Sequence, residues 1–464
     1  LTEQDLEVVV DLQASGISLE EPQRKQQTIR VEANQWERVN WWATVDSADF
    51  VSLVFSVNGG GLQDAARPDG GDIPILNYAS PATLATSGVL INETESLEVV
   101  SLPRSYKPIG GSLQVEMTSS LAGAMLGGLE AFEAYPYDFN EPVISRVFAN
   151  LAVQAVIKSG DRQYPDLESK LQAAIRDGLD RMEMLQNEDG GWGWIKGSDS
   201  QVDISAYGLL ALNQAVEAGF IVDAQALENA NRFLESRLFV PRMSHDQHQL
   251  DNITLTVFAL GPLNARTTVL DGLFSVREKL SPWSQALAAM LFVEREDERA
   301  ADLISNLKSS AIRSASGVNW QQESIGWYPQ NSPLATTGAV VSALAKVDPA
   351  SPLLADAVRY LIDHRRGTGG WNSSYETAWI LKGLERVIAA TGEVNAETTF
   401  TVTLNDVPLA SGGGSAQQGV QVVRSETPLE ELSAEYGNLL GFTRESCPGR
   451  LYYRALLELY QPVS

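Results

Sequence analysis

Cysteine is almost absent from this chain of 464 residues, which contains a single one, Cys447. One cysteine cannot form an internal disulfide, and it excludes zinc sites built from several cysteines and redox-active cysteine pairs. It is compatible both with a reducing compartment and with a bacterial secreted protein that has no disulfides. Cysteine usage therefore does not choose between these two locations.

Basic residues are also scarce relative to acidic ones, with 34 Lys and Arg against 59 Asp and Glu and a formal net charge of −25. A chain with this charge is repelled by phosphate backbones and by anionic membrane surfaces. No uninterrupted apolar run approaches the roughly 18 residues that identify a membrane-spanning helix. We therefore expect no nucleic-acid partner and no membrane span within these residues.

Apolar and polar residues alternate with a period of two at both ends of the chain. The alternating runs are residues 6–12, 51–57 and 113–117 near the start, and 400–404 and 451–460 near the end. Such short runs, separated by turn-rich pieces, predict half-buried antiparallel strands. The first residues, LTEQDLEVVVDLQ, contain neither a start methionine nor a signal peptide, so we expect the chain to be part of a longer protein.

Between the two β-type regions the apolar period becomes helical. About twelve amphipathic segments are predicted, at residues 118–134, 141–158, 166–187, 201–218, 223–237, 248–261, 264–280, 282–295, 297–314, 332–346, 351–364 and 374–391. A glycine-tryptophan phrase recurs between them, as QNEDGGWGW, GVNW and GTGGW, and each copy precedes a helix rich in small residues. This weak repetition of helix pairs indicates a repeating all-helical architecture.

These patterns predict an α+β multidomain chain. About six helical hairpins would close into an α/α toroid over residues 118–394, with small residues allowing the inner helices to approach each other. Neither β flank alone has enough strands for a sandwich, so residues 1–117 and 395–464 are predicted to form one discontinuous antiparallel β-sandwich. Insertion is tolerated where the ends of the inserted unit lie close together, as in a closed toroid.

Two enzyme classes fit this architecture in principle. QNEDGGWGW is similar to the Gln-Trp motif of terpene and squalene cyclases, but the Asp-rich acid motif of those enzymes is missing. A polysaccharide hydrolase or lyase on a toroid would need only a pair of carboxylates, and it remains the alternative function. Its candidate residues are the acids Glu188, Asp189, Asp199, Asp203 and Glu376 and the sugar-stacking tryptophans Trp192, Trp194, Trp320, Trp327 and Trp371. Helix caps, solvated loop charges and turn-anchoring core tryptophans are the commoner roles for these residues.

Histidine-dependent or metal-dependent catalysis has little basis in this sequence. His245 and His248 have the i, i+3 spacing that could place both on one helical face. No third histidine lies near them, and His364 occurs in a basic helix end, DHRRG. We therefore predict no metal site, no cofactor and no catalytic residue.

The stretch SLQVEMTSSLAGAMLGGLEAFEAYPYDFNEPVISRVF, residues 112–148, carries the most specific motif. It resembles the entry to the thioester domain of bacterial alpha-2-macroglobulins, where a strand and a Ser-rich helix start precede YPYGCxEQ and then SR. The matching residues are Leu113, Val115, Ser119, Ser120, Leu121, Leu129, Tyr135, Pro136, Tyr137, Glu141, Ser145 and Arg146. In that family an α/α toroid is inserted within a CUB-like β domain, so the resemblance extends to the predicted layout.

The chain departs from the family pattern at the residues that would make the thioester. The resemblance implies a cyclic bond between a cysteine and a glutamine three residues later, but Phe139 and Pro142 occupy these positions and Asp138 replaces the glycine. Neither Phe139 nor Pro142 can form the bond, and catalysis by a nucleophile needs an activatable atom. We predict that Phe139 fills the buried pocket that once shielded the bond and that Pro142 lies in the first turn of the next helix.

The resemblance implies the CUB-like and thioester-type domains of a protease inhibitor that has no thioester. In such a protein a protease cleaves a bait region elsewhere, and the inhibitor then holds the protease without covalent capture. The implied partners are proteases and the other macroglobulin domains of the same chain. The implied location is the bacterial cell envelope, most simply the periplasm, and the chain itself is not an enzyme.

Overall fold

The computed structural model describes residues 3–46, 48, 50–75, 79–91, 93–133, 139–160, 164–261, 264, 266–321, 332–366, 369–392, 398–414, 422–445 and 450–462. Six residues named above lie outside this set: Tyr135, Pro136, Tyr137, Asp138, Trp327 and Cys447. The chain divides into two compact units, one formed by Leu1–Pro81 with Tyr460–Ser464 and one formed by Ala82–Leu459. The predicted β domain over residues 1–117 therefore crosses a boundary between units.

The first unit contains the two earliest predicted strands. Its elements are β1 (Leu6–Ser15), β2 (Ile17–Leu19), η1 (Pro22–Lys25), β3 (Gln26–Val31), β4 (Ala43–Val45), β5 (Phe50–Gly59), β6 (Leu62–Ala66) and β7 (Ile73–Pro74). The larger sheet has the order β3-β1-β5-β6, with β7 also paired to β5, and β2 pairs with β4. These strands alternate like those of the second unit, so periodicity alone could not reveal that they form a separate sheet.

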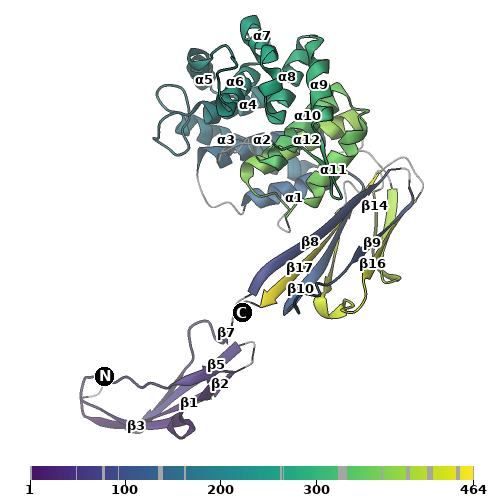
Figure 1. Cartoon of the computed structure of the whole chain (residues 1–464). Helices are drawn as coiled ribbons and strands as arrows, with labels where there is room; N and C mark the ends of the chain where they lie inside the picture. The colour runs from purple at the N-terminus through teal and green to yellow at the C-terminus, as the bar shows by residue number, and fades with distance from the viewer. Residues whose placement is uncertain are drawn as a thin grey trace. The chain divides into compact units, whose positions relative to one another are not determined.

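The second unit contains two four-stranded sheets. Their strands are β8 (Ala79–Leu90), β9 (Glu95–Val100), β10 (Gly110–Thr118), β13 (Thr398–Leu404), β14 (Val407–Gly414), β15 (Val422–Pro428), β16 (Asn438–Arg444) and β17 (Leu451–Pro462). One sheet has the order β15-β10-β17-β8 and the other β14-β13-β16-β9. Figure 1 shows the early, blue strands lying beside the late, yellow ones.

Strands from before and after the helices thus complete the same sheets. Val115 of β10 is opposite Ser425 of β15, and Val99 of β9 is opposite Leu439 of β16. The two sheets share a buried core, in which the rings of Phe442 and Tyr453 stack with centroids 3.9 Å apart. The helical segment is therefore inserted between strands of one two-sheet assembly.

All twelve predicted helices are present. They are α1 (Leu121–Glu133), α2 (Asn140–Ser159), α3 (Pro165–Leu185), α4 (Val202–Glu217), α5 (Ala224–Arg237), α6 (Gln247–Leu260), α7 (Thr267–Ser275), α8 (Pro282–Glu294), α9 (Arg299–Ser309), α10 (Pro333–Val347), α11 (Pro352–Asp363) and α12 (Ser374–Thr391). Two are shorter than predicted. After α7 the chain forms a 3-10 turn at Arg277–Lys279, and after α9 it forms a hairpin of β11 (Ile312–Ser314) and β12 (Gly317–Asn319).

Five helices, α5, α6, α8, α10 and α12, begin at a residue whose side chain accepts a hydrogen bond from a free backbone N–H group. Asp223 accepts from the N–H of Ala226, and Asp246 forms a reciprocal capping box with Gln249. Ser281, Ser332 and Ser373 cap α8, α10 and α12 in the same way. Such caps each stabilise a helix by about 0.5–2 kcal/mol. They explain why the starts of these five helices could be predicted closely from the sequence.

The even-numbered helices contact one another in a closed cycle. Helix α2 packs on α4, α4 on α6, α6 on α8, α8 on α10, α10 on α12, and α12 returns to α2. Odd-numbered helices such as α3, α5, α9 and α11 pack against this ring (Figure 1). Small residues allow the close approach, because a Cβ added at Gly383 of α12 would meet the carbonyl group of Gly338 in α10.

The glycine-tryptophan phrases are structurally equivalent. In each, the tryptophan is buried, its indole N–H donates to a carbonyl of the preceding odd-numbered helix, and its backbone N–H donates to a hydroxyl of the following even-numbered helix. The residues are Trp192 with Met182 and Ser205, Trp320 with Leu307 and Thr337, and Trp371 with Leu361 and Thr377. Gly190 and Gly369 have φ of 88° and 92°, and a Cβ at either would clash with a backbone carbonyl. These tryptophans anchor turns and are not available to stack sugars.

Candidate functional site

The motif predicted from the sequence lies at the start of α2, and the structure describes three of its residues. Tyr135, Pro136, Tyr137 and Asp138 are outside the described residues, whereas Phe139, Glu141 and Pro142 are within them. Phe139 immediately precedes α2, with an extended backbone at φ −85° and ψ 153°. Its carbonyl accepts a hydrogen bond from the N–H of Val143 at 3.3 Å.

Phe139 does not fill a closed pocket, and this part of the prediction is wrong. Its exposed fraction is 43%. The next residue, Asn140, is held by the loop after α3, because its backbone N–H donates to the carbonyl of Trp194 and its side chain donates to the carbonyl of Gly193. Backbone and amide contacts with this loop therefore fix the start of α2, and the phenyl ring is left at the surface.

The exposure of Phe139 leads to a stability prediction. Phe139→Ala should change the free energy of unfolding by no more than about 0.5 kcal/mol, as for other surface substitutions. Chemical denaturation followed by helical circular dichroism measures this change. Phe132→Ala on α1 is the matched control, because Phe132 is buried and its loss should cost about 3–5 kcal/mol. Equal losses for the two variants would contradict the exposed position of Phe139.

Pro142 is the third residue of α2 and lies in its first turn, as predicted. The first N–H groups of a helix have no intrahelical acceptor, so a proline loses no hydrogen bond there. The segment that would hold a thioester glutamine is therefore an ordinary helix start.

Glu141 is the most deeply placed acid of the motif, and it forms the centre of a buried polar cluster. Its carboxylate accepts from the Ser145 hydroxyl at 2.5 Å and from the Ser374 hydroxyl at 2.8 and 3.0 Å. The hydroxyls of Ser145 and Tyr207 lie 3.0 Å apart. We call Glu141, Ser145, Tyr207 and Ser374 the Glu141 cluster. It connects α2, α4 and α12 at neighbouring positions of the helical ring.

Burial controls the protonation of the Glu141 cluster. Desolvation raises the pKa of Glu141, and the hydrogen bonds from Ser145 and Ser374 only partly oppose it. Burial also raises the pKa of Tyr207 well above its usual value, and the neighbouring Glu141 raises it further. Tyr207 is therefore a neutral hydroxyl at physiological pH.

Aromatic side chains of neighbouring helices pack around Tyr207 of the Glu141 cluster. The ring of Tyr207 lies 5.2 Å from that of Tyr375 and 5.5 Å from that of Phe148, both edge to face. Trp379 stacks on Tyr207 at 6.2 Å. Arg146, the residue after Ser145 on α2, donates to the carbonyl of Phe132 at 3.0 Å and so connects α2 to the end of α1. Ser145 and Arg146, which match the SR of the family motif, thus both make contacts that hold the helices together.

The arrangement is suited to holding helices together and not to attacking a substrate. A serine hydroxyl beside a carboxylate can be an activated nucleophile, but Ser145 is fully buried and Ser374 is 3% exposed. Both hydroxyls already donate to Glu141. Ser374 and Tyr207 were not singled out from the sequence, because they come from helices far along the chain and belong to no local motif.

The acids proposed for a hydrolase or lyase have structural roles or remain in solvent. Asp189 accepts from the N–H of Gly191 and from the Ser200 hydroxyl. Asp203 is buried at the start of α4, where it accepts from its neighbour Ile204, and burial raises its pKa. Glu376 accepts from the N–H of Asn372 and the Ser332 hydroxyl. Glu188 and Asp199 are exposed.

The histidines do not assemble a metal site among the described residues, where no group of three or more His, Cys, Asp or Glu side chains could hold an ion. His245 accepts from the N–H of Arg242 at 3.2 Å, and His248 pairs with Asn252 at 3.1 Å. His364 contacts the carbonyl of Tyr360 at 2.8 Å. Within the same residues, no helix is long and apolar enough to cross a bilayer.

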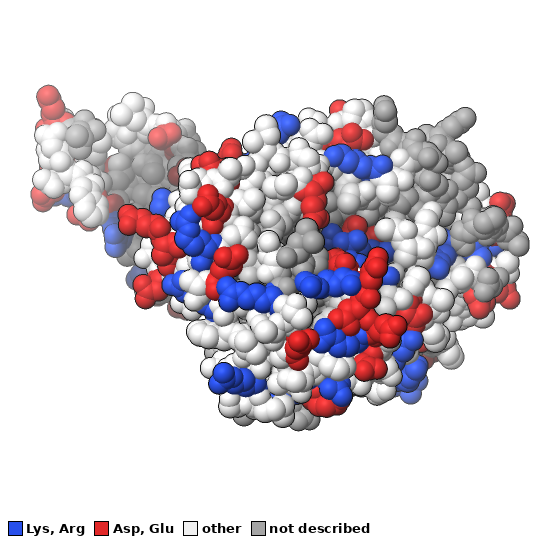
Figure 2. Space-filling model, turned by 90° about the horizontal axis from the view of Figure 1, so that it is seen from above, with Lys and Arg blue, Asp and Glu red and all other residues white. Residues whose placement is uncertain are grey.

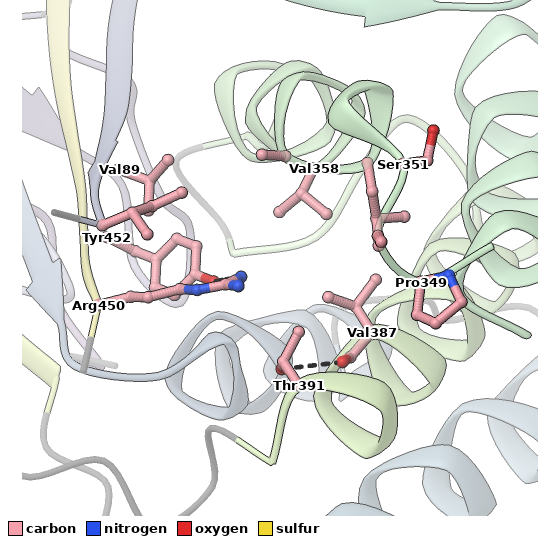
Figure 3. A pocket seen from close by; sticks show the side chains of 12 residues that line it. Val89, Pro349, Ser351, Val358, Val387, Thr391, Arg450 and Tyr452 are labelled. Atoms are coloured by element: carbon pink, nitrogen blue, oxygen red, sulfur yellow. Dashed lines mark hydrogen bonds between the residues drawn. The ribbon is translucent and has the colours of Figure 1, made fainter. Parts of the chain in front are cut away.

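One cavity of about 260 Å³ lies between the sheets and the helices of the second unit (Figure 3). Its walls are mostly apolar, with Val89 and Tyr452 from the strands opposite Val358 and Val387 from α11 and α12. Arg450 points into it from the strand side. No acidic side chain lines this cavity, so it cannot supply the carboxylate pair of a glycoside hydrolase.

Figure 2 gives the distribution of charged side chains over one face of the molecule. Figure 2 shows acidic and basic side chains interspersed on the face that it presents, without an extended basic area. A nucleic-acid interface requires such an area.

Known proteins are similar to this chain in both sequence and fold. Alpha-2-macroglobulin of Thermotoga maritima is 23% identical over 417 residues, which are 87% of this chain and 24% of that protein. Mouse alpha-2-macroglobulin-like protein 1 is 20% identical over 324 residues, 62% of this chain and 22% of that protein. The chain thus spans less than a quarter of these relatives. No family model matches it.

The fold of the whole chain is similar to that of one part of a bacterial protein. The native conformation of Escherichia coli alpha-2-macroglobulin superposes with a TM-score of 0.57 at 16% identity, over 100% of this chain and 28% of that protein. A structure of the same protein from its domain MG7 to the C-terminus gives 0.56, with 71% of that chain covered.

Proposed function

Because the chain belongs to the alpha-2-macroglobulin family, a family of protease inhibitors, we propose that it forms the CUB-like and thioester-type domains of such an inhibitor and has no thioester. The strand pairing across the helical segment carries the proposal. Strands β8–β10 and β13–β17 build the same two sheets, which is the layout of a β domain with an inserted helical domain. The closed cycle of even-numbered helices supports a toroid for the insert.

The first unit, which the sequence pattern placed in the discontinuous β-sandwich, is assigned here to a different domain. Among the described residues, strands β1–β7 share no sheet with the strands around the helices. We assign them to a separate macroglobulin-type domain, and we restrict the CUB-like domain to β8–β10 and β13–β17. The fit of the whole chain to a structure that begins at a domain named MG7 supports this division.

The absence of a thioester rests on the residues of the motif. Phe139 has no nucleophile, Pro142 has no carboxamide, and the single cysteine is Cys447, far along the chain. The described start of α2 has the geometry of a plain helix start, with Glu141 engaged by two serines. Protease capture by the full-length protein would therefore be non-covalent, and we place that protein in the bacterial cell envelope.

The absence of a thioester predicts that the chain does not react with methylamine. The chain should contain one free thiol before and after denaturation, and methylamine should not change its mass. A mass lower than that of the translated sequence by one ammonia, located at residues 138–142, would show that an internal acyl bond exists. Intact-mass and peptide-mass spectrometry measure both quantities.

The inhibitor function is tested with the full-length protein and a protease such as trypsin. We expect cleavage of a large protein substrate to be suppressed, while cleavage of a short chromogenic peptide continues. A denaturing gel should show the protease free of covalent adducts. An unimpeded cleavage of the large substrate would contradict the inhibitor function, and a covalent adduct would contradict the non-covalent mechanism.

A polysaccharide hydrolase or lyase is not favoured. Its candidate acids lie in turns, in the first turn of a helix or exposed in loops, and three of its candidate tryptophans are buried turn anchors. No described observation supports this alternative.

A further inference from the structure

A second cavity of the second unit contains an unusual concentration of arginines for a chain with a net charge of −25. Its volume is about 280 Å³. Four arginines line it, namely Arg365 and Arg366 from the segment between α11 and α12, Arg424 from β15 and Arg454 from β17. We call it the arginine cavity. Its walls come from both the sheets and the helical insert.

The charges inside the arginine cavity do not balance. Arg365 and Arg454 are 3% and 7% exposed, and the only carboxylate on its inner wall is Glu116 of β10. The other acids that line it, Glu130 and Glu426, are exposed at the rim. Glu116 pairs with Arg365 and, at 3.1 Å, with Arg424. One buried guanidinium is thus in excess, and a buried charge without a counter-charge is costly.

Arg454 is the cation in excess. Its terminal nitrogens donate to the backbone carbonyls of Arg365 and Arg366. The carboxylates of Glu116 and Asp363 act on Arg454 through their charge, but none of the described carboxylates forms an ion pair or a hydrogen bond with it. The Nε atoms of Arg454 and Arg365 are buried and have no hydrogen-bond partner among the described residues. Burial, followed by the like charge of Arg365, lowers the pKa of Arg454 to about 10. The side chain therefore still carries its charge at neutral pH.

Glu116 is held ionised by its partners. Burial alone would raise the pKa of Glu116, but the charges and hydrogen bonds of Arg365 and Arg424 outweigh it and lower the pKa. Glu116 therefore neutralises one positive charge at all physiological pH values and cannot act as a proton donor. Among the residues that line the cavity, Arg454 is therefore the buried cation without a carboxylate paired to it.

We propose that the arginine cavity binds a small molecule with a single carboxylate. A guanidinium presents parallel N–H donors that match the two oxygens of a carboxylate. One negative charge balances the one buried cation in excess, whereas a dianion would add repulsion from Glu116. Leu456 of β17 also lines the cavity and gives a short apolar tail a surface to contact.

Such a ligand would connect two parts of the fold. Arg454 belongs to β17, whereas Arg365 belongs to the segment that leads into α12. A carboxylate bound between them would stabilise the packing of the helical insert against the sheet. This inference does not depend on protease inhibition, because it uses only the charges and the geometry of the cavity.

Calorimetric titration of the whole chain with propionate, at constant ionic strength in chloride, tests the proposal. We expect saturable binding with one site, and weaker binding of sulfate under the same conditions. Arg454→Met should weaken propionate binding at least about tenfold, a loss of about 1.4 kcal/mol. Because removal of a buried arginine can impair folding, Arg424→Gln is a second variant with a more exposed side chain, and it should weaken binding as well.

Glu116→Gln should change the propionate affinity in the opposite direction, and it is the most specific test of the proposal. It removes the internal carboxylate that competes for Arg365 and Arg424, so propionate should bind about tenfold more tightly. Arg232→Gln is the control, because this exposed residue pairs only with Glu228 on α5 and its loss should leave binding unchanged. The proposal is overturned if propionate shows no saturable binding, if Glu116→Gln binds no more tightly, or if sulfate binds more tightly than propionate.

Discussion

Trp192→Ala should lower the free energy of unfolding of the helical insert by about 3–5 kcal/mol, the usual range for removing a large buried aromatic ring. Trp192 is completely buried. Its indole N–H donates to Met182 at the end of α3, and its backbone N–H donates to Ser205 on α4. The ring therefore joins two helices that are separated by a long loop, and its removal leaves both a cavity and an unpaired carbonyl.

Trp194 supplies a matched control two residues away. Its exposed fraction is 40%, so Trp194→Ala should cost less than about 1 kcal/mol. Trp192→Phe should lie between the two, because it keeps most of the ring but loses the hydrogen bond to Met182. Urea denaturation followed by helical circular dichroism reports on the insert separately from the β units. A loss for Trp192→Ala no larger than that for Trp194→Ala would show that the tryptophan is not an anchor.

The helical insert could be predicted from the sequence because its signals are local. Asp246, Ser281 and Ser373 mark helix starts by capping them, and the apolar period of 3.6 residues marks each buried face. The glycine-tryptophan phrases predicted a repeat, and the equivalent contacts of Trp192, Trp320 and Trp371 explain why the phrase recurs.

The division of the β region could not be predicted in the same way. A strand of residues 6–15 alternates like one of residues 110–118, and alternation does not identify the partner strand. Pairing is decided by contacts far apart in the sequence, such as Val115 opposite Ser425. The predicted β domain therefore included strands β1–β7, which pair only with one another among the described strands.

Only part of the candidate site could be predicted from the sequence, again because some of its contacts join distant parts of the chain. The replacements at Phe139 and Pro142 can be identified from the sequence alone, because the motif that contains them is one short continuous segment. The partners of Glu141 are not, since Ser374 is 233 residues away. The error over Phe139 arose because the residue at the position of the family's cysteine was assumed to be buried, whereas the phenyl ring is 43% exposed.

Glu141→Ala is expected to have the second large effect on stability. The substitution leaves the hydroxyls of Ser145 and Ser374 without their acceptor, and each buried unsatisfied group costs about 1–3 kcal/mol. For the two hydroxyls together, a loss of about 2–6 kcal/mol is expected for the helical insert. Glu141→Gln keeps an acceptor oxygen of the same shape and should lose much less. Glu188→Ala, at an exposed position, is the control for the removal of one negative charge.

The pH dependence separates the role of the charge from that of the hydrogen bonds. Burial raises the pKa of Glu141 in the folded protein above its unfolded value of about 4.3. The folded state therefore binds the proton more tightly, and this stabilisation is fully present below about pH 4 and is lost as the pH rises through the folded pKa. Glu141→Gln is neutral throughout, so its stability relative to the wild type should increase between about pH 4 and neutrality. A constant difference between Glu141→Gln and wild type over this range would contradict the raised pKa, and a wild-type stability for Glu141→Ala would show that the Glu141 cluster does not hold α2, α4 and α12 together.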